Sequence, residues 1–141
     1  MIAFLSIRTF RSRLQSLLAY KRGVYAGADR EIVSAFATAT IDEIRNNRDM
    51  ILIDDPVVVV KLRLPDHKNK RSRKDGYRLI YLTYRNQEKV VFLDIYPKNG
   101  PSQQIDTSDE RLLDLIQAYN EESVASELVS HNLSEGYCNF Y

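Results

Sequence analysis

The 141-residue sequence has few of the residues that hold small folds together through covalent or metal bonds. It contains one cysteine, Cys138, two histidines, His67 and His131, and no tryptophan. A lone cysteine cannot form an internal disulfide, and these three residues do not have the spacing of a zinc site. We therefore expect neither a disulfide nor a metal ion, as suits a protein of the reducing cytoplasm.

Long apolar runs are also missing. The N-terminal run MIAFLSI ends at Arg8 and lacks the length and the cleavage site of a signal peptide. No segment reaches the roughly 18 apolar residues that a membrane-spanning helix needs. With 44% hydrophobic and 28% charged residues, the composition is that of one domain with a real core and no membrane partner.

The net charge of +1 conceals a strong separation of charge along the chain. Residues 61–78 carry eight Lys and Arg against two Asp, a local charge of +6. Residues 102–141 carry one Arg against eight Asp and Glu, a local charge of −7. The basic segment is a candidate contact for phosphate groups, although such runs are often only solvated.

Hydrophobic periodicity predicts the order of the elements. Residues 1–7 are expected to form a strand, and helices are expected over 10–22, with Thr9 as N-cap, and over 29–47. Strands follow over 57–64, 77–84 and 89–96, the last two forming a hairpin. Residues 66–75 lack apolar side chains and are expected to be a solvated loop, and a final helix is capped by Asp106 or Ser108.

This order predicts an α+β domain, a small and largely antiparallel β-sheet with two N-terminal helices and a C-terminal helix. We assign residues 1–122 to the domain and residues 123–141 to an extension that packs on it and permits a further helical stretch. Within the strand 57–64, alternation places Val58, Val60, Leu62 and Leu64 on the core face, with Lys61 and Arg63 on the other face.

Three segments in this order resemble the RelE/ParE toxins of bacterial type II toxin–antitoxin systems. They are KLRLP at 61–65, DGYRLIYLTY at 75–84 and VVFLDIYPKNG at 90–100. The sequences of the second and third segments are most similar to the HigB-like branch. The resemblance covers residues 57–120 well and residues 1–56 only by element order. It implies a RelE-like fold and a toxin whose protein partner is a neutralising antitoxin.

The resemblance also implies an activity. Members that cleave RNA are ribosome-dependent mRNA interferases, endoribonucleases that use no metal or cofactor and stop translation. Their activity is carried by residues matching Lys61, Arg63, Arg78 and the region of Lys98, and we add Tyr96 as a residue for base stacking or proton transfer. Arg78 offers a planar fork for phosphate oxygens, and a lysine among cations can act as a base.

Further candidates lie in the basic loop. Its cations are expected to contact RNA: Lys68, Lys70, Arg71, Arg73 and Lys74. His67 in the same loop is a possible general base, whereas Asp94 is expected to be a hydrogen-bonded structural carboxylate. Every one of these residues also has an ordinary structural interpretation, as the solvated face of a strand, a surface ion pair or a turn.

The register of the hairpin decides whether a site exists. A three-residue loop at 86–88 would pair Arg78 with Tyr96 on one face, whereas a two-residue loop would pair Arg78 with Ile95 and turn Tyr96 to the opposite face. Two other functions remain open. One is a ParE-like inhibitor of DNA gyrase, and the other is a non-catalytic interaction protein whose acidic extension covers the basic face.

Overall fold

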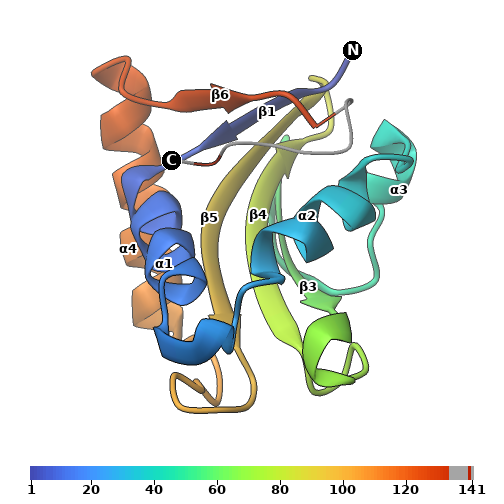
Figure 1. Ribbon diagram of the computed structural model, residues 1–141. Coiled ribbons are helices and arrows are strands. Elements are labelled where there is room, and N and C mark those ends of the chain that lie inside the picture. Colours follow the sequence, from blue (N-terminus) through green and yellow to red (C-terminus); the bar gives the residue numbers. More distant parts are fainter. Residues whose placement is uncertain (134–139, 141) are drawn as a thin grey trace.

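The computed structural model describes residues 1–133 and residue 140. Six strands form one sheet, and four α-helices and two short 3-10 turns connect them (Figure 1). In chain order the elements are β1 (Ala3–Ser6), α1 (Arg8–Leu18), η1 (Lys21–Gly23), α2 (Ala28–Phe36), α3 (Ile41–Arg45), β2 (Met50–Asp54), β3 (Val57–Leu64), η2 (His67–Asn69), β4 (Tyr77–Tyr84), β5 (Lys89–Pro97), α4 (Asp109–Val124) and β6 (Val129–His131).

The predicted α+β class is confirmed. The strands lie in the order β2-β3-β4-β5-β1-β6, and every neighbouring pair is antiparallel except β1 and β5. Helices α1, α2 and α3 pack on one face of the sheet, where stacked and edge-on contacts join four aromatic rings, Phe4, Phe10, Phe36 and Phe92. Helix α4 lies against the other face, where the Tyr119 hydroxyl meets that of Tyr84 at 2.6 Å.

The N-terminal helices differ from the prediction in two respects. Helix α1 begins at Arg8, so Thr9 lies inside it and Ile7 is the N-cap. The predicted helix over 29–47 is two helices, because Thr40 starts α3 with a capping box. Its hydroxyl accepts the Glu43 backbone N–H at 3.2 Å, and the Glu43 carboxylate accepts the Thr40 backbone N–H at 3.3 Å.

Both edge strands of the sheet were missing from the prediction. Strand β2 pairs with Val57–Val60 of β3, although most of its residues are exposed and few contribute to the core. Residues 129–131, in a segment whose sequence permits a further helical stretch, form β6 beside β1. The described part of the 123–141 extension therefore lies at the far edge of the sheet from β3, and Phe140 packs against Phe10 and Phe92.

We expected His131 and Cys138, for which the sequence offers no partner, to be structural residues. His131 hydrogen-bonds Ser6 at 2.7 Å and lies beside the ring of Phe140, as suits a structural residue. Cys138 lies outside the described residues. Within the described ranges, 1–133 and 140, no helix has the length and apolar character required to cross a membrane.

Candidate nucleic-acid interface

A β-bulge in β5 brings the predicted residues into one row. Near the turn Thr83 pairs with Val90, in the register of a two-residue loop. One extra residue, Leu93, then separates the partners of Tyr81 and Ile80, and beyond it Arg78 pairs with Tyr96. Since Arg63 of β3 pairs with Arg78 in turn, Arg63, Arg78 and Tyr96 lie side by side on one face of three neighbouring strands.

Arg78 holds the end of the basic loop. It is only 8% exposed, and its guanidinium donates to the backbone carbonyls of Arg73 at 2.9 Å, Lys74 at 2.8 Å and Tyr77 at 3.3 Å. Burial lowers the pKa of Arg78, and the neighbouring charge of Arg63 lowers it further. Three of the five N–H groups of the fork are thus engaged with the protein's own backbone.

Three other predicted site residues, Lys61, Lys98 and Tyr96, form hydrogen bonds or ion pairs with residues 105–107, which follow β5. The Lys61 ammonium forms an ion pair with Asp106 at 2.6 Å, which lowers the pKa of that carboxyl. The Lys98 ammonium donates to the Ile105 carbonyl. Tyr96 is fully buried, and its hydroxyl accepts a hydrogen bond from Thr107 at 3.2 Å. Burial raises the pKa of Tyr96, so neither its ring nor an ionised hydroxyl is open to a ligand.

Arg63 is the open member of the set. Its side chain is exposed, and among residues 1–133 and 140 the guanidinium has no hydrogen-bond or ion-pair partner. The backbone here is also open, because β2 pairs only with Val57–Val60 and its flanking Asp49 carbonyl reaches only Lys61. Among the described residues Leu62–Leu64 have no neighbouring strand on this side, and these three residues are the free edge of β3. The Lys61 N–H points to this side, toward the Asp49 carbonyl at 3.1 Å, so the polar groups of Arg63 two residues later point the same way.

The basic loop is ordered where it meets the N-terminal helices, contrary to the expectation of a fully solvated loop. Asp66 is buried and caps η2 through Asn69, and the Lys68 ammonium donates to the Gly23 carbonyl. Arg71 exchanges backbone hydrogen bonds with Asp66 at 2.9 and 3.0 Å. Lys70, Arg73 and Lys74 are exposed. The five predicted RNA contacts therefore divide into an anchor, Lys68, and four other cations, of which Arg73 lies on the free edge of β3.

His67 is held by a residue that sequence reasoning missed. Its ring Nδ1 lies 2.9 and 3.0 Å from the two carboxylate oxygens of Glu31, and its backbone N–H donates to the same carboxylate at 2.7 Å. Glu31 lies on the buried face of α2, where nothing in the helical pattern separates it from a surface acid.

The prediction for Asp94 is confirmed. Its buried carboxylate accepts from the Ile95 N–H and meets Arg13 at 3.5 Å and Arg111 at 3.3 Å.

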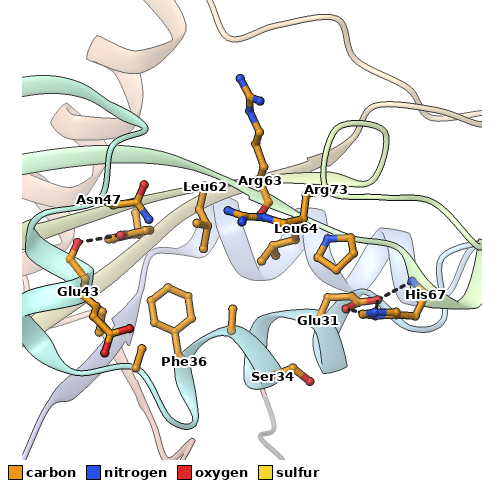
Figure 2. A pocket seen from close by; sticks show the side chains of 15 residues that line it. Glu31, Ser34, Phe36, Glu43, Asn47, Leu62, Arg63, Leu64, His67 and Arg73 are labelled. Atoms are coloured by element: carbon orange, nitrogen blue, oxygen red, sulfur yellow. Dashed lines mark hydrogen bonds and ion pairs between the residues drawn. The ribbon is translucent and has the colours of Figure 1, made fainter.

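A groove of about 440 Å³ opens beside the free edge of β3. It lies between this edge and helices α2 and α3, and Figure 2 shows Phe36 and Leu62 facing each other across it, with the Glu31–His67 pair at one end and Glu43 at the other. Arg63 extends away from the groove floor, whereas Arg73 runs back along the strand, where its Nε donates to the Arg63 carbonyl at 3.2 Å.

No three His, Cys, Asp or Glu side chains gather into a group able to hold a metal ion within the described ranges. Comparisons with protein-family models, curated proteins and solved structures found no match. The resemblance to RelE/ParE toxins therefore depends on the three sequence segments alone.

Proposed function

We propose that this protein is a toxin of the RelE/ParE type that acts in the cytoplasm as a metal-free, ribosome-dependent mRNA interferase. The observation that carries the proposal is the row Arg63–Arg78–Tyr96, which joins the three segments of the resemblance on one face of the sheet. The proposed partners are mRNA on the ribosome and a neutralising antitoxin.

The support for RNA as the ligand is electrostatic. Arg63 adds an exposed planar fork at the edge of β3, Arg73 lies beside it, and Lys70 and Lys74 of the same loop are exposed. Arg78 keeps two N–H groups beyond those bonded to the loop. Transition-state charge on the phosphorus is stabilised by such groups, and loss of one donor typically costs about 10²–10³ in rate.

Lys61, Lys98 and Tyr96 enter this proposal differently from what the resemblance implies. Each forms a hydrogen bond with one of residues 105–107. Lys61, Lys98 and Tyr96 therefore hold residues 105–107 in place unless RNA displaces this segment. The described part of the extension, by contrast, does not cover the basic face, because β6 and Phe140 lie at the β1 side of the sheet.

The experiment is induction of the protein in bacterial cells, followed by primer extension on transcripts and a DNA supercoiling assay. We expect transcript cleavage and growth arrest with wild type, and loss of both with Arg63→Ala. Arg8→Ala is the matched control, because this exposed arginine at the start of α1 pairs with Glu127. Intact transcripts together with altered supercoiling would replace the proposal with gyrase inhibition.

A second measurement examines the contact itself. Binding of a single-stranded RNA to the purified protein should weaken steeply with salt, because phosphate contacts release counterions. Arg63→Ala should reduce both the affinity and the salt slope, whereas Arg8→Ala should change neither. RNA binding that is insensitive to salt would contradict the proposed role of the cations.

A further inference from the structure

The proposed function leaves proton transfer unassigned. Of the five residues expected to carry catalysis, Lys61, Lys98 and Tyr96 are engaged or buried, and the two arginines remain charged at any ordinary pH. In-line attack on a phosphodiester needs a group that takes the proton of the 2′-hydroxyl. A suitable proton acceptor is exposed and held in one orientation, beside the edge of β3 that carries Arg63.

The Glu31–His67 pair has this form. The Glu31 side chain is 7% exposed and accepts hydrogen bonds only, so the proton of the imidazole lies on Nδ1, facing the carboxylate. The His67 side chain is 80% exposed, and within the described part of the chain its Nε2 has no hydrogen-bond partner. A neutral imidazole fixed in this tautomer leaves Nε2 as its proton acceptor, and His67 is among the residues that line the groove.

The groove beside it suits one nucleotide. Its volume of about 440 Å³ falls within the roughly 300–1,000 Å³ of small-ligand sites. Its middle is lined by half-buried Ala35 and by the outer edges of the core residues Phe36 and Leu62, an apolar surface against which a nucleobase can rest. At the far end Glu43 uses one carboxylate oxygen in the capping box, which leaves the other as an acceptor for a base amine.

The charges at the two ends and along the edge of the groove determine the orientation of a bound nucleotide. Arg73 runs along the free edge of β3 and Arg63 extends from the same edge on the side away from the groove, so phosphates are favoured along this edge and are disfavoured beside Glu43. His67 follows the same strand after Pro65, at the end of the groove opposite Glu43 (Figure 2). An RNA strand that follows the edge would thus place a base in the groove and its ribose toward His67.

We propose that the groove binds one nucleotide of a single-stranded RNA, with the phosphates of the strand along the β3 edge that carries Arg63 and Arg73, and that His67, positioned by Glu31, is the general base. This inference rests on the proposed function. His67 Nε2 takes the proton of the 2′-hydroxyl, and the 2′-oxygen forms a bond to the adjacent phosphorus. The bond from phosphorus to the 5′-oxygen of the next nucleotide breaks. That oxygen takes a proton from water, and the imidazolium returns its proton to the remaining hydroxide.

Filling the groove tests where the base binds. Ala35→Trp places an indole on a half-buried groove wall, and Ala37→Trp places the same indole on an exposed position that does not line the groove. The probe is a fluorescein-labelled, mixed-sequence RNA of about ten nucleotides, followed by anisotropy. Since stacking of one base contributes about 1–3 kcal/mol, Ala35→Trp should weaken binding about tenfold or more. Affinity within twofold of the Ala37→Trp control, with an unchanged melting temperature, would overturn the proposal.

Chemical rescue tests His67. In a cleavage assay with mRNA-programmed ribosomes, His67→Ala should lower the rate by about 10²–10⁴, and added imidazole should restore a part of it. A merely structural role in docking the loop would give no rescue. Wild-type rates in His67→Ala, or loss of activity that imidazole does not restore while Tm is unchanged, would overturn the assignment.

The two proposals fail separately. If Arg63→Ala abolishes RNA binding while Ala35→Trp and His67→Ala behave as wild type, the groove and the base are wrong and the RNA function stands. If the wild-type protein binds no RNA and cleaves none on the ribosome, both proposals are wrong.

Discussion

Removal of the Arg78 guanidinium should loosen the basic loop as well as remove a cation. The side chain is buried and donates to three backbone carbonyls at 2.8–3.3 Å. Hydrogen bonds from a charged group contribute about 1.5–3 kcal/mol each. The carbonyls of Arg73 and Lys74 belong to exposed residues and can turn to water, so the net loss in Arg78→Ala should be about 2–4 kcal/mol rather than the full sum.

The assay combines urea unfolding with amide hydrogen exchange. For a chain of this length the loss corresponds to a fall in melting temperature of roughly 6–15 °C. Exchange should accelerate over residues 71–77 before it does elsewhere, because the local anchor is lost. Arg78→Lys should recover little, since an ammonium cannot reproduce the fork. Arg63→Ala should stay within about 0.5 kcal/mol of wild type, because its side chain is exposed.

One result would refute this reasoning. If Arg78→Ala unfolds at the wild-type urea concentration and its loop exchanges at the wild-type rate, the guanidinium does not hold the loop. Loss of RNA cleavage in such a protein would then assign Arg78 to the substrate alone, as the sequence resemblance implies.

Three further predictions concern the scaffold of the site. Gly76→Ala should lower the free energy of unfolding by about 1–3 kcal/mol in urea titrations, because a Cβ would stand 2.1 Å from a carbonyl oxygen of β3; unchanged stability would contradict that packing. Arg13→Ala with Arg111→Ala should cost about 3–5 kcal/mol by leaving the buried Asp94 carboxylate unpaired, and adding Asp94→Asn should recover part of it. Burial raises the pKa of Tyr84 to about 12, so its stabilisation is present below pH 10 and is lost as pH rises toward 12. Tyr84→Phe should therefore flatten the alkaline fall in stability.

Much of the fold could be predicted, because the hydrophobic periodicity is strong where one face of a helix or strand is exposed to solvent. In β3 the alternation of valine and leucine with Lys61 and Arg63 identified both faces. The capping box at Thr40 and Glu43 was also readable, and it would have divided the second helix. Strand β6 has only three residues, too few for any period, and β2 is an apolar strand that is mostly exposed, against the usual pattern.

The site could not be predicted to the same extent. In β5 nearly every residue is buried, so apolar alternation cannot report the register, and the bulge at Leu93 uses both of the registers considered. The partners of the cations were equally hidden. Glu31 and Asp106 are far in sequence from His67 and Lys61, and only the tertiary fold brings them together.

The segment Gly76-Tyr77-Arg78 illustrates why a motif and a mechanism need separate evidence. Gly76 lies so close to β3 that a side chain would collide with its backbone, and Arg78 ties the preceding loop to the sheet. A protein with this fold would need both residues even if it cleaved nothing. The residues that discriminate a nuclease from a binding protein are therefore those that stability does not require. Two residues meet this condition: Arg63, which is exposed and unpaired within the described ranges, and His67, whose ring is exposed. If their substitution abolishes activity and leaves stability unchanged, the result would be evidence for catalysis, which the sequence motif alone cannot supply.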